Sequence, residues 1–309
     1  ALNMCNYDLT RKVLIAEAWC PASMADATHA ALRRATARSG AQMPSIMNVI
    51  ESDDTPPTYI RTNKFTSAFQ TIVDTYGVPR YGELNPAAFT IVTFPFLFGV
   101  MFGDVGHGLI VVLFALYFIA NERRFSASAD EMDAIIGYAW GGRYVLLLMG
   151  LFSIYAGLVY NDYFGVMGAL FGSAFVLPPE REGDAFVRAE TGGVVPFGVD
   201  PVWGRAENEL TFSNSYKMKM SIILGVTQML LGLGCSLANA LHFRSEVDLW
   251  CEFVPQVLFL LSTFGYLVFC IIYKWTVDWH FHGRPAPSLI SLLIAFFMKP
   301  GTIPKDAHL

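Results

Sequence analysis

Asp104 and His107 are the two residues whose types and position point most directly to chemistry. They lie in the segment FGDVGHG (102–108), which interrupts a long apolar run over residues 87–120. A carboxylate and an imidazole at membrane depth are costly unless they face protein, water or the interface. Broken helices in transporters bring such groups to an ion path. The segment is therefore a candidate proton relay.

The same segment also fits a turn at the membrane surface, where both side chains meet water. A spanning helix needs about 20 apolar residues, and the flanking runs, 87–102 and 109–120, are each shorter than that. We therefore favour a helical hairpin that reverses at 102–108. Asp104 and His107 remain our candidates for residues near a proton path.

Other residues of types that could bind a metal ion or catalyse a reaction are explained more simply by their surroundings. Asp278, His280 and His282 have types and an alternation that suit a metal ion. They lie among tryptophans and other aromatic residues, which is typical of a membrane interface, so we expect no metal site. The sequence has no GxxxxGK[ST] phosphate loop and no Ser/His/Asp or Cys/His spacing typical of nucleophilic catalysis. We expect neither a catalytic residue nor a cofactor in this chain.

The composition indicates an integral membrane protein. Of the 309 residues, 54% are hydrophobic and 15% are charged, and the mean hydropathy is +0.42. An ordinary soluble domain has about 25% charged residues. The net charge of −5 gives no reason to expect nucleic acid. The five cysteines form no CxxC pair, and we expect them to be reduced and structural.

Charge is concentrated in the N-terminal part of the chain, which we expect to be a partial α/β lobe outside the membrane. Residues 12–19 form a short run compatible with a β-strand, and residues 23–39 carry apolar side chains at helical spacing up to Gly40. Residues 62–76 place their apolar side chains on one face. This pattern predicts an amphipathic helix that delivers the chain to the membrane.

The rest of the chain, residues 83–309, predicts a membrane domain. We expect spans near 85–104, 106–121, 134–160, 217–241 and 252–274, a polar loop over 161–216 and an interfacial segment over 286–299. Within residues 220–241 and 253–273 there is no Asp, Glu, Lys, Arg or His. A proton path needs ionisable side chains. Either these two helices are scaffold for a path completed elsewhere, or the chain moves no protons.

Small residues in the later spans predict close helix packing. The third span contains Gly150 and Gly157, and the fourth contains Gly225, Gly232 and Gly234. Lysines and arginines flank the spans on both sides. The positive-inside rule therefore does not decide the orientation.

Long strings in the chain are similar to subunit a of the vacuolar-type proton ATPase. These strings cover residues 63–108, 142–162, 196–203, 214–229 and 253–275. Two shorter strings, IAEAWCP (15–21) and TPPTY (55–59), extend the resemblance into the soluble part. Strings of this length are more specific than short motifs, and together they run over nearly the whole chain.

The resemblance implies the orientation that composition leaves open. Residues 1–82 would be the end of the cytosolic N-terminal domain, and residues 83–309 the first part of the membrane domain in the Vo sector. The FGDVGHG turn and the loop over 161–216 would then be lumenal. The chain would be a fragment of a longer protein whose essential arginine lies on a helix beyond Leu309, so no catalytic residue is assigned here.

The resemblance also implies the partners. In this family, ATP hydrolysis on separate subunits turns a proteolipid ring, whose carboxylates pass two proton half-channels. The expected partners are the proteolipid c-ring, the peripheral stalk subunits E and G, subunits C, H and d, other Vo and V1 subunits, and the lipid bilayer. The chain would be no enzyme on its own. It would lie in the membrane of the vacuole, the lysosome or another endomembrane, or in the plasma membrane.

We therefore expect a stator subunit of an ATP-driven rotary proton pump. The expected fold is an α-helical integral membrane protein with about five transmembrane helices and a partial cytosolic α/β lobe. The alternative is a secondary ion transporter with a broken-helix site at FGDVGHG. That class needs two related halves, and no second break of this kind occurs in the later runs. A receptor or purely structural membrane protein is the third class.

Overall fold

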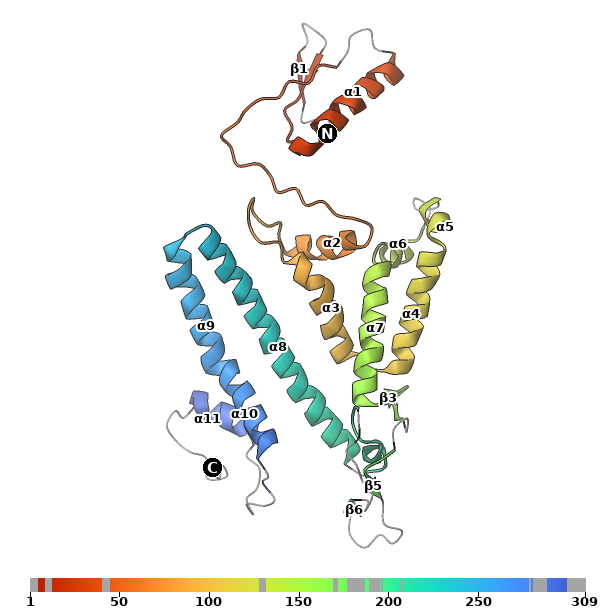
Figure 1. Cartoon of the computed structure of the whole chain (residues 1–309), viewed down its shortest axis with the longest axis vertical. Helices are drawn as coiled ribbons and strands as arrows, with labels where there is room; N and C mark the ends of the chain where they lie inside the picture. The colour runs from red at the N-terminus through yellow and green to blue at the C-terminus, as the bar shows by residue number, and fades with distance from the viewer. Residues whose placement is uncertain are drawn as a thin grey trace. The chain divides into compact units, whose positions relative to one another are not determined.

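The chain folds as two compact units, which we describe separately. One unit comprises Ala1–Thr62 and Tyr76–Glu83, and the other comprises Asn63–Thr75 and Leu84–Leu309. The computed structural model, drawn in Figure 1, describes residues 5–8, 13–40, 45–127, 132–168, 172–176, 187–188, 195, 197–206, 208–277, 279 and 288–298.

In its described residues, the first unit contains a short hairpin and one α-helix. Strands β1 (Asn6–Asp8) and β2 (Val13–Ile15) pair antiparallel. After one 3₁₀ turn, helix α1 (Ala25–Ser39) ends at Gly40, whose φ of 65° is the left-handed conformation that glycine adopts readily at a helix C-terminus. The helix predicted over residues 23–39 is thus confirmed. The strand is shorter than the predicted run 12–19, and the larger α/β lobe stays a prediction.

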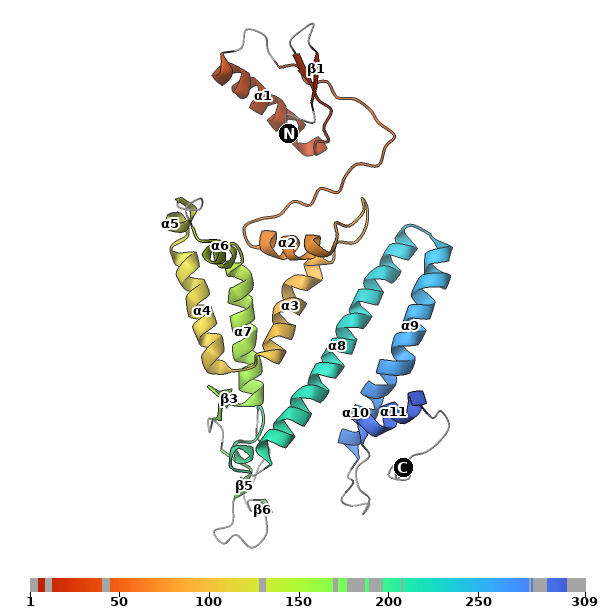
Figure 2. The ribbon, with the colours of Figure 1, turned by 180° about the vertical axis from the view of Figure 1, so that it is seen from behind.

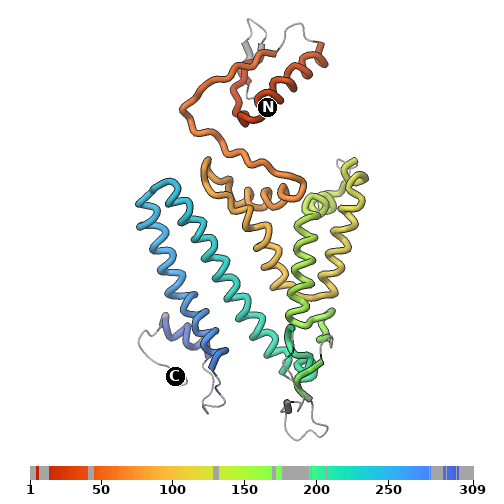
Figure 3. The backbone as a smooth tube through the Cα atoms, viewed as in Figure 1, coloured from red at the N-terminus to blue at the C-terminus, as the bar shows by residue number. Residues whose placement is uncertain are grey.

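Helix α2 (Thr66–Tyr76) opens the second unit and is the predicted amphipathic helix. Its start is fixed by a reciprocal pair of bonds. The side-chain oxygen of Asn63 accepts from the Thr66 N–H at 2.8 Å, and the Asn63 N–H donates to the Thr66 hydroxyl at 3.0 Å. Phe69 and Val73, one turn apart, are buried. In the tube drawing of Figure 3, α2 lies across the beginning of the next helix.

Helices α3 (Ala87–Met101) and α4 (Val105–Ala120) form the predicted hairpin, with the reversal between Met101 and Val105. Both pack along α7 (Arg143–Tyr160). Figures 1 and 2 show the three helices side by side from opposite directions, with the reversal at the end away from α2. The reversal predicted at FGDVGHG is confirmed.

The segment before α7 is not one helix with it. We expected a single segment over 134–160, but α6 (Ala134–Gly141) and α7 meet at Gly142 as two helices. The side chain of Asp133 accepts from the Ala134 N–H and begins α6. A short helix, α5 (Glu122–Ala127), lies between α4 and α6.

Among the described residues, three segments are long and apolar enough to cross a membrane: α7, α8 (Glu209–His242) and the continuous helical stretch Asp248–Thr276. Helix α8 has 34 residues, about 50 Å at the rise of an α-helix. It begins inside the segment 161–216 that we expected to be loop. Its first turns are polar, so hydropathy alone does not assign them to a span.

The stretch Asp248–Thr276 alternates between two helical geometries. It consists of a π-helical turn η5 (Asp248–Phe253), α9 (Val254–Leu260), a second π-helical turn η6 (Leu261–Gly265) and α10 (Tyr266–Thr276). A shorter apolar helix, α11 (Leu289–Met298), follows.

Polar contacts connect α8 with α3 and with the segment that precedes α3. The Gln228 side chain donates to the Thr93 hydroxyl at 3.3 Å, and the Asn239 side chain accepts from the Leu84 N–H at 2.9 Å. Within a membrane the hydrophobic effect does not drive helices together, so interhelical hydrogen bonds of this kind contribute to their association.

The described part of the long loop between α7 and α8 contains short hairpins and one 3₁₀ turn. Strands β3 (Asp162–Tyr163) and β4 (Val166–Met167) pair antiparallel, as do β5 (Phe175–Val176) and β6 (Val187–Arg188). The turn η4 (Pro201–Arg205) is begun by Asp200, whose side chain accepts from the Val202 N–H.

Glycines allow α4 and α7 to approach at backbone distance. A Cβ atom at Gly157 would lie 2.4 Å from the Val105 nitrogen and 2.7 Å from the Asp104 carbonyl carbon. A Cβ atom at Gly150 would lie 2.7 Å from a Val112 methyl carbon. In α8, by contrast, a Cβ atom at Gly225 would meet no atom of the described residues within 4 Å. The predicted role in close packing therefore applies to the α7 glycines.

We expect Gly157→Ala to destabilise the folded protein by about 1–3 kcal/mol, because the new methyl group has only backbone to displace. Gly225→Ala is the matched control, and we expect it to be neutral or to stabilise by up to about 1 kcal/mol through helix propensity. The measurement is the temperature at which each variant loses monodisperse elution in mild detergent. Equal midpoints for the two variants would contradict the packing argument.

Candidate functional site

The carboxylate of Asp104 is the centre of the turn between α3 and α4. Its Oδ1 accepts from the Gly106 N–H at 2.7 Å, the His107 N–H at 3.0 Å and the Phe164 N–H at 3.1 Å. The first two bonds make Asp104 the N-cap of α4. The third comes from the β3–β4 turn, so one oxygen joins the hairpin to the loop that follows α7.

His107 is the second member of the site and is more exposed. Its Nδ1 lies 2.8 Å from Asp104 Oδ2, and its side chain is 51% exposed against 14% for Asp104. The imidazole lies between two aromatic rings, with centroids 6.0 Å from that of Phe102 and 5.2 Å from that of Phe164. The structure therefore brings the two predicted residues together, with the histidine toward solvent.

Hydrogen bonds keep Asp104 ionised. Burial raises the pKa of its carboxyl, but the bonds from the His107 N–H and ring, the Phe164 N–H and the Gly106 N–H outweigh burial and lower the pKa from 3.8 to about 2. Because the pKa is lower in the folded than in the unfolded state, the carboxylate stabilises the fold fully at pH values above its unfolded-state pKa. This stabilisation is lost as the pH falls toward 2. Asp104 is thus an anion at neutral pH.

Residues of α7 hold the turn from the other side. The Ser153 hydroxyl donates to the Phe102 carbonyl, and the Tyr160 hydroxyl donates to the Val100 carbonyl at 3.0 Å. Both carbonyls belong to the last turn of α3 and its exit, which the helix itself leaves unsatisfied. Ser153 and Tyr160 were not predicted, because nothing in an apolar helix shows which of its few hydroxyl groups faces a neighbouring helix end.

The beginning of the long loop is anchored to the same end of α7. Asn161 has a φ of 58° and donates from its side chain to the carbonyls of Gly168 and Val199 at 2.8 and 3.2 Å. Asp162 pairs with Lys217 at 3.3 Å. Asp162 therefore links the loop to the polar start of α8.

A second carboxylate orders the loop further along. Burial raises the pKa of Asp200, but bonds from the Ser173 hydroxyl and from the N–H groups of Val202 and Ala174 lower it below its usual value overall. The Ser173 bond is 2.6 Å long. Asp200 therefore connects the segment around residue 173 to the turn η4.

A second polar cluster lies at the other end of α4 and α7. In this cluster, which we call the Glu122 cluster, the Glu122 carboxylate is 2.7 Å from the Lys64 ammonium and 3.2 Å from the Arg143 guanidinium. The hydrogen bond from Lys64 is the main cause of a lowered pKa of Glu122. Lys64 precedes α2, so the pair ties α2 to the start of α5.

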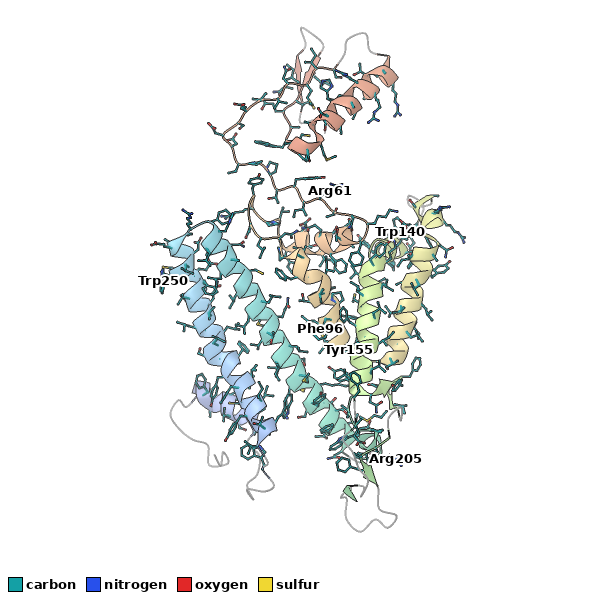
Figure 4. All side chains as sticks on the ribbon, in the orientation of Figure 1. Arg61, Phe96, Trp140, Tyr155, Arg205 and Trp250 are labelled. Atoms are coloured by element: carbon teal, nitrogen blue, oxygen red, sulfur yellow. The ribbon has the colours of Figure 1, made fainter. Side chains whose placement is uncertain are left out.

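Arg143 is the buried member of the Glu122 cluster. Its side chain is 7% exposed, donates to the Trp140 carbonyl at 3.0 Å and lies over the rings of Trp140 and Tyr144 at 4.7 and 4.8 Å. Figure 4 labels Trp140 at one end of the bundle and Arg205 at the other. Arginine suits this place because its planar cation can stack on rings and bond in the plane at the same time.

The arrangement gives Asp104 and Arg143 structural roles at opposite ends of α4 and α7, and it places the half-exposed His107 ring against Asp104. The alternative metal residues Asp278, His280 and His282 lie outside the described residues. No sequence signal indicated the Glu122 cluster, because Lys64, Glu122 and Arg143 come from three separate segments.

Comparison with known proteins gives consistent matches along the chain. The V-type ATPase 116kDa subunit family matches residues 1–309. The V-type proton ATPase 116 kDa subunit a 1 of Mus musculus is 46% identical over 96% of this chain, and the V-type proton ATPase subunit a of Schizosaccharomyces pombe is 47% identical over 98%. The vacuolar isoform of Saccharomyces cerevisiae is 45% identical over 99%. The chain spans 36–37% of the length of these curated relatives.

We expect the Asp104 carboxyl to remain ionised down to about pH 3, because its folded-state pKa is about 2. Infrared difference spectra between the wild type and Asp104→Asn should therefore show no protonated carboxyl band at pH 5. The band should grow in only below about pH 3. A band with a midpoint above pH 4 would mean that the backbone donors do not hold the charge.

Proposed function

Because the chain belongs to the V-type ATPase 116 kDa subunit family, we propose that it works as the stator subunit of an ATP-driven rotary proton pump. In this role it frames the proton half-channels beside a proteolipid ring and couples the membrane domain to the peripheral stalks. ATP hydrolysis takes place on other subunits, so the chain is no enzyme on its own. The identity of 45–47% over nearly the whole chain is the observation that supports this proposal most strongly.

The proposed topology has about five spans. Helices α3 and α4 form a short hairpin, followed by α6 with α7, by α8 and by the stretch Asp248–Thr276. Residues 1–82 are the end of a cytosolic α/β domain, and residues 83–309 belong to the membrane domain. The support is that the Glu122 cluster and the Asp104 turn lie at opposite ends of α4. The cluster is then cytosolic, and the turn and the long loop are lumenal.

Asp104 and His107 are proposed to lie near the lumenal mouth of the proton path. His107 is half-exposed, and its Nδ1 lies within hydrogen-bond distance of Asp104 Oδ2. Asp104 is better suited to orient that ring, because its oxygens already accept three backbone N–H groups. The proposed compartments are the vacuole, the lysosome and other endomembranes, or the plasma membrane.

The alternative, a secondary transporter with a site at FGDVGHG, has less support. Such a site needs ligand atoms free to bind an ion at a helix break. Here the carboxylate of Asp104 caps α4 and bonds to Phe164, so its oxygens are engaged by the protein itself.

The experiment that tests the function is a census of the subunits that copurify with this chain from native membranes in mild detergent. ATP hydrolysis is measured on the same particle. We expect an ATPase head, peripheral stalk subunits, subunits C, H and d, and a proteolipid ring. Recovery of an intact chain alone, or as a small homo-oligomer without ATPase, would instead support the transporter or receptor class.

We expect Asp104→Asn to slow acidification of sealed vesicles by up to about tenfold, equivalent to roughly 1.4 kcal/mol in the limiting step. The complex should assemble normally, because the amide oxygen can still cap α4. Asp133→Asn is the matched control, since Asp133 caps α6 at the other end of the bundle. An unchanged acidification rate in Asp104→Asn would remove this residue from the proton path.

A further inference from the structure

The short helix α5 carries the sequence Arg123-Arg124-Phe125-Ser126, whose role the proposed function leaves unexplained. The two arginines and the serine are exposed. Arginines three and two residues before a serine form a charge pattern that basic-directed protein kinases select through their own acidic residues. We propose that Ser126 is a phosphorylation site for such a kinase. The proposal rests on the proposed function in one respect, the cytosolic side of α5.

The reaction transfers the γ-phosphoryl group of ATP to the serine. A bond forms between Ser126 Oγ and the γ-phosphorus, and the bond from that phosphorus to the bridging oxygen of ADP breaks. The hydroxyl proton passes to the kinase's catalytic base. The products are phosphoserine and ADP.

Local structure allows a kinase to reach this segment. Helix α5 has only six residues, and a helix of that length is marginal without tertiary contacts. Glu122 holds the first residue of α5 through its ion pairs with Lys64 and Arg143. Beyond it, the ring centroid of Phe125 lies 5.9 Å from that of Tyr117 and 5.0 Å from that of Phe118. A kinase that draws Ser126 into its active site must therefore displace the Phe125 ring, while the ion pairs of Glu122 can stay in place.

The chain contains an internal comparison with the same spacing. In α1, Arg33-Arg34-Ala35 precedes Thr36. The Thr36 hydroxyl donates to the Leu32 carbonyl at 2.9 Å and lies 2.9 Å from the Ser45 hydroxyl. Thr36 is also half-buried within a helix of 15 residues. Ser126 and Thr36 thus follow the same arginine pattern, but they differ in the exposure of the hydroxyl group and in the length of the helix that carries it.

Phosphorylation at this position would act on the Glu122 cluster. Ser126 follows Glu122 by four residues on α5, so the two side chains share a face. A phosphate of about −2 charge repels the carboxylate and offers Lys64 a competing partner. The Lys64 side chain is 75% exposed and can move. The contact between α5 and the start of α2 is thereby weakened.

The first test uses sealed vesicles that contain the intact complex with its ATP-binding side outward. They are incubated with the catalytic subunit of an arginine-directed kinase and ATP, and phosphate is located by mass spectrometry. We expect phosphate on Ser126, with little on Thr36. The rate should fall about tenfold or more in Arg123→Gln/Arg124→Gln, as a lost charge-assisted contact implies, and labelling should vanish in Ser126→Ala.

The outcomes separate this site from the proposed topology. Labelling of Ser126 only after the vesicles are opened with detergent would support the site and overturn the cytosolic assignment of α5. The site would be overturned if Ser126 were not labelled in either state. It would also be overturned if Arg123→Gln/Arg124→Gln were labelled at the wild-type rate. All these outcomes leave the copurification of an ATPase unaffected.

A second measurement tests the link to the Glu122 cluster. Hydrogen exchange of the backbone amides of residues 63–69 is compared between phosphorylated complex and a Ser126→Ala complex treated identically with kinase. We expect faster exchange in the phosphorylated complex. Equal exchange rates would show that the modification does not reach α2.

Discussion

The structure depends on one carboxylate oxygen that satisfies three backbone N–H groups at the reversal between α3 and α4. The first N–H groups of a helix have no partner within the helix and need one from outside it. Asp104 Oδ1 accepts from the N–H groups of Gly106 and His107 at the start of α4, and also from the Phe164 N–H. Because Phe164 belongs to a different segment, the same bond fixes the loop after α7 against the hairpin. A single residue thus determines where two short helices turn and where the long loop starts.

The close contact between α4 and α7 follows from the same place. Gly157 lies directly against the backbone of Asp104 and Val105, so the cap and the packing surface share atoms. Tyr160, one turn further along, reaches back to the carbonyl of Val100. The end of α7 therefore supplies both the space and the hydrogen bonds that the reversal needs. At the opposite end, Arg143 and Glu122 secure the helices by charge instead of by close backbone approach.

Local patterns in the sequence predicted the elements whose cause is local. The helix over 23–39, the amphipathic helix before the membrane and the reversal at FGDVGHG follow from periodicity, capping residues and the length of apolar runs. Asp104 and His107 are three residues apart at a helix start, so their contact is also a local feature. The domain boundary at residue 82 stays a prediction.

The features that sequence reasoning missed are tertiary. The Phe164 N–H is 60 residues from the carboxylate it contacts, and Lys64 is 58 residues from Glu122. The division of the 134–160 segment at Gly142 and the early start of α8 at Glu209 were also missed. At Gly142 the apolar run continues although the helix is interrupted. At Glu209 the helix begins before the apolar run does. Hydropathy reports solvent preference, and it does not report where a backbone changes direction.

The two π-helical turns in the stretch Asp248–Thr276 give this segment an unusual internal geometry. Each π turn accommodates one residue more than α-helical winding does, which rotates all later side chains by about 100° around the axis. Side chains before and after Leu261–Gly265 therefore follow different angular registers, although the axis is continuous. The continuous helical stretch thus presents differently oriented faces before and after η6. Removal of a single residue within Leu261–Gly265 would bring these two faces into one register.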